Sequence, residues 1–144
     1  MCREASRLDC KTVFYSARKT SLCERAVKRS FSQLRLNLKE ISFAVDKNSL
    51  CKALTTAFRE CNIVFVIGGL CLDGERGIEN VISHLVKASC VDECKRLKNP
   101  SGDDGFVIRA QSQLLVLLPD EPEQIEAIMQ GAISGYIKAV PCYN

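Results

Sequence analysis

The sequence predicts an α/β domain in which helices cover both faces of a mostly parallel sheet, with an antiparallel hairpin added near the end. Short apolar runs alternate along the chain with segments whose apolar residues recur at helical spacing. One run, 63–67 (IVFVI), contains no polar residue, which is typical of a strand in the middle of a parallel sheet. Near the end, two apolar runs follow each other with only a turn between them. These patterns indicate a three-layer α/β/α sandwich.

The first half of the chain predicts two strand–helix units. A strand is expected at 11–16 (KTVFYS), and Ser21 with Glu24 three residues later forms a capping-box pattern for the helix that follows. A second strand is expected at 41–45 (ISFAV), and Asn48 or Ser49 can cap the next helix. The apolar stripes of these helices are Leu22, Ala26, Val27, Phe31 and Leu34, then Leu50, Leu54, Ala57, Phe58 and Cys61.

The second half predicts a buried strand, a helix, a hairpin and a last helix. The strand at 63–67 ends in a glycine turn, and an amphipathic helix is expected over 78–86. A loop at 99–105 precedes strands at 106–109 and 114–118, which the segment AQSQ joins as a hairpin. Pro122 suits the first turn of a final helix. The apolar face of that helix is Ile125, Ile128, Met129, Ala132, Ile133, Tyr136 and Ile137.

Length and composition predict one soluble domain over residues 1–144. The chain has 144 residues and 47% apolar content, enough for one core. No apolar run approaches the roughly 20 residues of a membrane span, and the first residues lack the apolar stretch of a signal peptide. We therefore expect a cytoplasmic protein without a membrane partner.

Charge and cysteine content narrow the classes of partner and cofactor. Residues 1–40 hold ten Lys or Arg against four Asp or Glu, a balance of +6, whereas residues 41–144 hold ten against thirteen, a balance of −3. The basic part lacks a nucleic-acid motif, so a solvated helix face is the preferred interpretation and a nucleic-acid partner is not expected. The nine cysteines are interpreted as small buried thiols. Cys90 and Cys94 have no second pair or nearby histidine, so no metal site is predicted.

The segment 62–77 (NIVFVIGGLCLDGERG) predicts a turn at the end of the buried strand. Ligands of open α/β sheets bind beyond the carboxyl ends of the strands, where Gly68 and Gly69 are expected. The segment is neither a P-loop nor a dinucleotide fingerprint. The two glycines alone are equally well explained as residues that permit a tight turn.

Three segments together resemble the molybdopterin-binding fold of MogA/MoaB-type proteins and of the CinA N-terminal domain. The first is IVFVIGGL at 63–70, the strand and glycine turn. The second is NPSGDDGF at 99–106, which is similar to the CinA-type loop Asn-Pro-x-Gly-Thr-Ala-Pro-Gly-Phe shortened by one residue. The third is LLVLLPDEPEQIEAIM at 114–129, similar to a strand followed by Leu-Pro-Gly-x-Pro-x-Glu-Met. They occur in the order of the family.

The resemblance implies a small phosphorylated ligand, a nucleotide or a pterin, bound between the glycine turn and the Leu-Pro-Gly loop. Proteins of this fold commonly self-associate, which implies a homo-oligomer. CinA-type domains are associated with metal-dependent cleavage of the ADP-ribose pyrophosphate. Glycine turns expose backbone N–H groups to phosphate oxygens, which accounts for such a site in physical terms. The implied ligand-binding residues are Gly68, Gly69, Leu70, Asp73, Glu75, Arg76, Asn99, Gly102, Asp103, Pro119 and Asp120.

Several positions depart from the family pattern, and most departures change a charge. Arg76 stands where the pattern has a second acid after the glycines, and Lys47 replaces an acid upstream. A cation at a metal-binding carboxylate position opposes metal binding. Asp120 replaces the glycine of Leu-Pro-Gly, and Arg18 lies where an acidic signature is expected after the first strand.

Three functions remain open on the sequence alone. The first is a binding domain with catalysis weakened or lost, in which Arg18, Lys47 and Arg76 neutralise phosphate. The second is an active hydrolase that requires a divalent ion such as Mg²⁺. The third is a non-catalytic assembly module. In the hydrolase, the metal ligands would come from Asp73, Glu75, Asp103, Asp104 or Asp120.

Overall fold

A six-stranded sheet forms the middle layer of the computed structural model, which describes residues 8–69, 93–100, 102, 104–110, 112–131 and 133–138. In spatial order the strands are β2-β1-β3-β6-β5-β4. β2, β1, β3 and β6 run parallel, and β5 is antiparallel to both of its neighbours. The strands are β1 (Leu8–Tyr15), β2 (Leu36–Ala44), β3 (Ile63–Ile67), β4 (Glu93–Leu97), β5 (Gly105–Ala110) and β6 (Gln113–Leu118).

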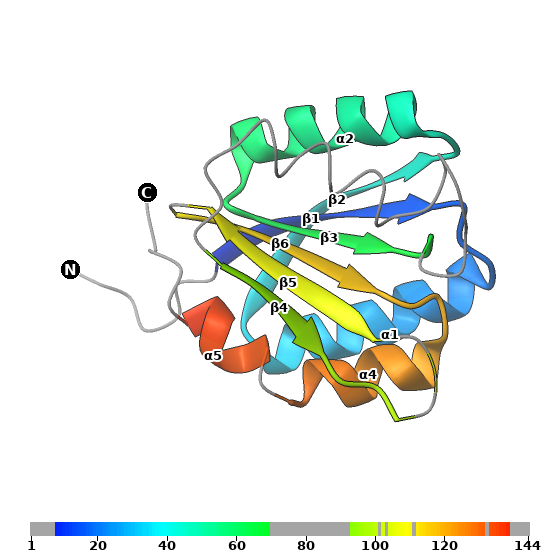
Figure 1. Cartoon of the computed structure of the whole chain (residues 1–144), viewed down its shortest axis with the longest axis vertical. Coiled ribbons are helices and arrows are strands. Elements are labelled where there is room, and N and C mark those ends of the chain that lie inside the picture. The colour runs from blue at the N-terminus through cyan, green and yellow to red at the C-terminus, as the bar shows by residue number, and fades with distance from the viewer. Residues whose placement is uncertain are drawn as a thin grey trace.

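Helices cover both faces of this sheet, as the sequence predicts. α1 (Thr20–Gln33), α4 (Pro122–Met129) and α5 (Ile133–Lys138) lie below the sheet in Figure 1, and α2 (Lys47–Glu60) lies above it. The three-layer, mostly parallel α/β architecture is therefore confirmed. Among the described residues, none of the helices has the length and apolar character of a membrane span.

Apolar side chains fill two core layers, one on each face of the sheet. Along β1, Cys10 and Phe14 belong to the layer against α1, and Val13 and Tyr15 to the layer against α2. This alternation follows from the two-residue period of a strand. All five residues of β3 are buried, which confirms the interpretation of 63–67 as a central strand.

The start of α1 differs from its prediction. Lys19 is the N-cap residue in a left-handed conformation (φ 53°), and no side chain caps the helix. The capping-box prediction for Ser21 and Glu24 is therefore wrong, and Glu24 instead pairs with Lys28 at 2.8 Å. Because α1 begins at Thr20, Ser21 already lies within its first turn. Leu22, predicted on the apolar face, is 49% exposed.

The start of α2 has a different cap from either predicted candidate. The Asp46 carboxylate accepts a hydrogen bond from the Ser49 backbone N–H at 2.8 Å, and Ser49 Oγ accepts one from the Asp46 backbone N–H at 3.1 Å. Asp46 is thus the N-cap, and Ser49 is the third helical residue of the capping box. The predicted stripe is confirmed, with Leu50, Leu54, Ala57 and Cys61 buried and Phe58 partly buried.

Other boundaries also differ from prediction. β2 begins at Leu36, immediately after Arg35 turns the chain with φ 59°, so its first half precedes the apolar run at 41–45. β4 was not predicted, because only Leu97 of its five residues is buried. The single final helix is divided into α4 and α5 by a turn in which the Gly131 N–H donates to the Ile128 carbonyl. The expected helix at 78–86 lies outside the described residues.

Candidate functional site

The carboxyl ends of the four parallel strands lie side by side at one edge of the sheet. The Gly68 N–H donates to the Leu118 carbonyl at 2.9 Å, which joins the end of β3 to the end of β6. The Ser16 N–H donates to the Ala44 carbonyl at 2.9 Å, which joins the end of β1 to the end of β2. Helices α1, α2 and α4 begin directly after this edge. The N-terminal ends of helices carry partial positive charge, which favours anions at this edge.

Gly68 and Gly69 form the turn after β3. Both are buried and have positive φ angles of 105° and 81°, which favour glycine. A Cβ atom at Gly68 would lie 2.5 Å from the Tyr15 carbonyl oxygen, so the end of β1 leaves no room for a side chain. Both glycines thus have the backbone conformation that the predicted turn requires, and Gly68 brings the end of β3 against the loop that follows β1.

Asp120 lies in the loop after β6 and forms an ion pair with Arg18 in the loop after β1. The carboxylate accepts hydrogen bonds from the Arg18 backbone N–H at 2.8 Å, from Nε at 3.1 Å and from Nη2 at 3.2 Å. Its side chain is only 9% exposed, whereas that of Arg18 is 67% exposed. Burial alone would raise the pKa of Asp120, but the hydrogen bonds and charge of Arg18 hold that pKa below its ordinary value.

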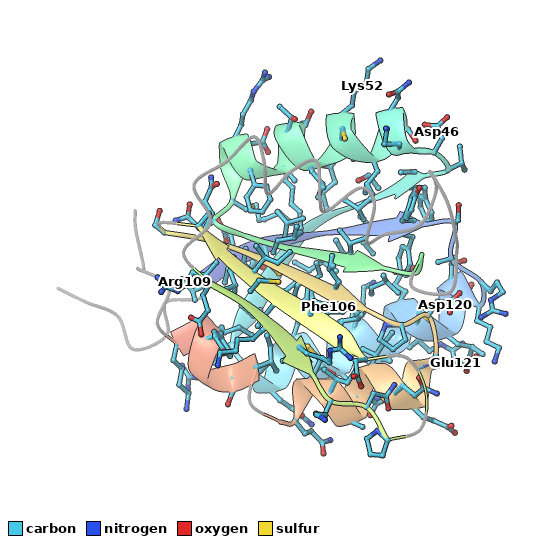
Figure 2. The ribbon with its side chains drawn as sticks, viewed as in Figure 1. Asp46, Lys52, Phe106, Arg109, Asp120 and Glu121 are labelled. Atoms are coloured by element: carbon cyan, nitrogen blue, oxygen red, sulfur yellow. The ribbon has the colours of Figure 1, made fainter. Side chains whose placement is uncertain are left out.

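A second ion pair joins the same two loops. Lys19 Nζ donates to both carboxylate oxygens of Glu121, at 2.9 and 3.0 Å. Two consecutive cations after β1 thus meet two consecutive acids after β6, with β3 between the two strands. Figure 2 shows Asp120, Glu121 and Asp46 at the same end of the molecule, and Arg109 at the opposite end.

The loop after β4 packs on the first turn of α4. Asn99 is buried, its Nδ2 donates to Gln124 Oε1 at 2.8 Å, and its backbone N–H donates to Asp104 at 2.7 Å. A Cβ atom at Gly102 would lie 2.7 Å from the same Gln124 oxygen. Asp104 also pairs with Arg96 at 3.5 Å. These contacts fix the loop against α4.

The structure brings some of the predicted site residues together. Gly68 and Gly69 directly follow β3, and Pro119 and Asp120 directly follow the β6 residue to which Gly68 is bonded. Asn99 and Gly102 lie at the first turn of α4. Lys47, predicted to neutralise phosphate, is the first residue of α2. The other predicted residues, Leu70, Asp73, Glu75, Arg76 and Asp103, lie outside the described residues.

Sequence reasoning missed the roles of Lys19 and Glu121, and it did not pair Arg18 with Asp120. One signal in the chain could have indicated both ion pairs: two basic residues follow one predicted strand and two acidic residues follow another. Because parallel strands end at the same edge, opposite charges at their ends are candidates for pairing. The spatial order of the strands decides whether they meet.

The described acids of this edge already have protein partners. Asp46 caps α2, and Asp120 is held by Arg18. Within the described ranges, no group of three or more His, Cys, Asp or Glu residues is arranged to hold a metal ion.

Solved structures with the same arrangement of elements cover most of this chain. CinA from Thermoplasma acidophilum superposes with a TM-score of 0.73 at 11% identity, over 90% of this chain and 98% of that protein. Molybdenum cofactor biosynthesis protein B gives 0.72 at 12% identity, over 96% of each chain. MoaB from Thermus thermophilus gives 0.71 at 9% identity, over 94% of this chain and 99% of that one. This chain has the molybdopterin-binding fold.

The likeness to these proteins is one of structure rather than sequence. No protein-family model and no curated protein matches the chain. At identities of 9 to 12%, the molybdopterin-binding fold itself is what the chain shares with them. The resemblance predicted from the glycine turn, the Asn-Pro loop and the Leu-Pro segment is confirmed at this level.

Proposed function

We propose that this molybdopterin-binding-fold chain binds a small phosphorylated ligand, a nucleotide or a pterin, at the carboxyl edge of its sheet, with hydrolysis weakened or lost. One observation carries the proposal. The turn of Gly68 and Gly69 lies at the carboxyl end of the central strand β3, and the starts of three helices lie at the same edge. Backbone N–H groups in such a place suit phosphate oxygens.

The ligand class is supported by the roles of the proteins with similar structures. One is a molybdenum cofactor biosynthesis protein and another is a molybdopterin biosynthesis enzyme, which favours a pterin. A nucleotide is supported by the sequence resemblance to CinA-type domains, which are associated with ADP-ribose. Both ligands combine a flat ring system with phosphate, so a basic loop such as that of Arg18 and Lys19 suits either.

The weakening of hydrolysis is supported by the partners of the described acids. Asp120 stands where the family pattern has a glycine. Its carboxylate binds Arg18. Asp104 accepts the Asn99 N–H and pairs with Arg96. Both carboxylates are thus oriented by protein donors, and the cations Arg18 and Arg96 beside them oppose the binding of a metal ion.

A thermal-shift screen tests the binding proposal. The panel is ADP-ribose, AMP, NAD and molybdopterin precursors, each at a concentration well above a micromolar dissociation constant. A ligand at about 100 times its Kd stabilises the folded state by about 2.7 kcal/mol, which raises the Tm of a domain of this size by about 5 to 10 °C. At least one member should produce such a shift. If no member of the panel raises the Tm, the proposal is contradicted.

An ADP-ribose hydrolysis assay separates binding from catalysis. Incubation with Mg²⁺, Mn²⁺ or Co²⁺ should give no turnover above the blank. Metal-dependent turnover would instead support the alternative of an active hydrolase, with ligands among Asp73, Glu75 and Asp103. The same preparation should be shown to bind ADP-ribose, so that an absence of turnover cannot be due to misfolded protein.

Self-association is a second proposal, and two exposed apolar residues at the end of β2 and directly after it favour it. Phe43 and Val45 are each 65% exposed, and β2 is an edge strand of the described sheet. Apolar side chains beside an unpaired strand edge are typical of surfaces that a partner covers. Light scattering should give a mass of at least twice the 16.0 kDa of one chain, and the mass of a single chain would contradict the proposal.

We place this activity in the cytoplasm. Cys10, Cys23 and Cys61 are free thiols buried in the described core, where oxidation would disturb packing. A reducing compartment suits such residues. Fractionation of cells expressing the tagged chain would test the assignment.

A further inference from the structure

The Arg18–Asp120 ion pair has the composition of an anion site that is already filled. A backbone N–H and two guanidinium N–H groups converge on one carboxylate at 2.8, 3.1 and 3.2 Å. A fork of guanidinium donors combined with a backbone N–H is also the set of donors that binds phosphate in many proteins. All the donors come from one residue, Arg18, at the edge where a phosphorylated ligand is proposed to bind.

Local structure does not explain why a carboxylate stands at residue 120. The N-cap of α4 is Glu121, and no side chain forms a capping hydrogen bond there. The partners of Asp120 instead come from the loop after β1, 102 residues away. Asp120 therefore connects two loops rather than terminating a helix, and moving its side chain would not remove a cap from α4.

Arg18 is accessible to a ligand from solvent, whereas Asp120 is not. The Arg18 side chain is 67% exposed and the Asp120 side chain 9% exposed. A phosphate approaching from solvent would meet the guanidinium first and the carboxylate behind it. The carboxylate already takes the Arg18 backbone N–H, Nε and Nη2, so a phosphate that binds to these three donors must displace it. Because the guanidinium is 67% exposed, water screens the attraction within this ion pair, which makes such an exchange feasible.

We propose that Asp120 is an internal competitor that occupies the anion position of Arg18, and that a phosphorylated ligand binds by displacing it. This inference rests on the proposed function, since it names the group that sets the affinity of that site. The Asp120 carboxylate lowers affinity for phosphate, and the fold loses the stability of this ion pair when the carboxylate is displaced. Glu121, which pairs with Lys19 beside it, retains its own partner.

Asp120→Asn provides the direct test, because it removes the charge and preserves the shape. Inorganic pyrophosphate and ADP-ribose are titrated into the wild-type chain and the variant by calorimetry at constant ionic strength. Asp120→Asn should bind at least about tenfold more tightly, as expected when a like charge is removed from the site. The double variant Arg18→Ala/Asp120→Asn should lose that gain. Glu93→Gln is the matched control: it removes one carboxylate from an ion pair with Arg109, at the opposite end of the molecule (Figure 2), and should change affinity by less than about threefold.

The outcomes separate the inference from the proposed function. If the wild-type chain binds and Asp120→Asn binds no more tightly, the inference is wrong and the proposed function stands. If only Asp120→Asn binds, the inference is supported. If no folded variant binds either pyrophosphate or ADP-ribose, both the proposed function and the inference are contradicted.

A measurement on the wild-type chain remains decisive if Asp120→Asn fails to fold. Pyrophosphate is titrated into ¹⁵N-labelled protein, and the backbone amide resonance of Arg18 is followed. Displacement of the carboxylate should shift this resonance with the same saturation curve as binding. Binding that leaves the Arg18 amide unmoved would overturn the proposal.

Discussion

At the scale of single residues, Gly68 is the position where the backbone restricts the sequence most. Its φ is 105°, and a Cβ atom there would lie 2.5 Å from the Tyr15 carbonyl oxygen. Both features oppose any side chain, the first by backbone strain and the second by direct overlap. The turn that carries the proposed ligand site is thus also a point at which β1 and β3 come close together.

Gly68→Ala should lower the free energy of unfolding by at least about 2 kcal/mol, measured by urea denaturation. Gly135→Ala is the matched control, because a Cβ atom at Gly135 meets nothing within 4 Å. Gly135 lies in α5, so alanine should be neutral or stabilise by up to about 1 kcal/mol. Equal effects of the two substitutions would show that the contact with Tyr15 does not matter.

Thr12 carries a buried hydroxyl without a hydrogen-bond partner in the part of the chain that the structure describes. Its side chain lies in the middle of β1, and the residue is fully buried. Thr12→Val keeps the shape and removes the polar atom, so it should raise the free energy of unfolding by about 1 kcal/mol. Thr55→Val, where the hydroxyl donates to the Cys51 carbonyl at 2.9 Å on an exposed surface, should not be stabilising. Destabilisation by Thr12→Val would indicate that the hydroxyl has an unseen partner.

At the scale of elements, α2 shows which features of a helix a sequence can predict. The apolar stripe of α2 was predicted because its side chains recur at helical spacing. Its cap was assigned to Asn48 or Ser49, whereas Asp46 performs that role. All three residue types are good caps, so their order along the chain does not decide among them.

Asp46→Ala should therefore destabilise the chain by about 1 kcal/mol, the usual cost of losing an N-cap. Asn48→Ala, at an exposed position within the first turn of α2, should change stability by only a few tenths of a kcal/mol. Thermal or urea unfolding of both variants measures the difference. A larger loss of stability for Asn48→Ala than for Asp46→Ala would indicate that Asn48, one of the two predicted candidates, caps the helix.

The Arg18–Asp120 ion pair, which connects the loop after β1 to the loop after β6, should make the stability of the fold depend on pH. Because Arg18 lowers the pKa of Asp120 in the folded state, the ionised carboxylate stabilises the fold above its unfolded pKa of about 4. That stability is lost as pH falls through the folded pKa. Asp120→Asn should therefore show a weaker loss of stability than wild type between about pH 5 and pH 3. Glu123→Gln, on the exposed side of α4, is the control for a general change of charge. Parallel pH profiles for wild type and Asp120→Asn would refute the assignment.

The sheet shows how far apolar patterns predict strands. β3 was predicted to the residue, because its five buried residues lie between Asn62 and Gly68. β4 was missed, because a charged edge strand such as ECKRL has one buried residue and no apolar run. The glycine turn and Asp120 were placed at the correct edge, since this follows from the order of elements. The pairing of Asp120 with Arg18 depends on contacts across the whole chain, which local patterns do not contain.

At the scale of the whole molecule, β2 is an edge strand of the described sheet and carries an exposed aromatic side chain. Phe43 stacks on Phe14 with ring centroids 5.4 Å apart, yet 65% of Phe43 remains exposed. If β2 contributes to self-association, Phe43→Lys should reduce the mass measured by light scattering to that of the monomer without unfolding the chain. Lys52→Ala, on the exposed surface of α2, is a control that should leave the mass unchanged. A multimer that survives Phe43→Lys would place the contact elsewhere.

The parallel pairing of β3 with β6 has a consequence for how the chain folds. Ala110 and Gln113 of the β5–β6 hairpin are close in sequence, and such a hairpin can form within microseconds. Ile63 must instead find Leu114 across a long intervening segment, and distant pairings of this kind form slowly. During synthesis, the glycine turn therefore leaves the ribosome well before the strand that completes it. The edge at which β3 meets β6 forms only after β6 has been made.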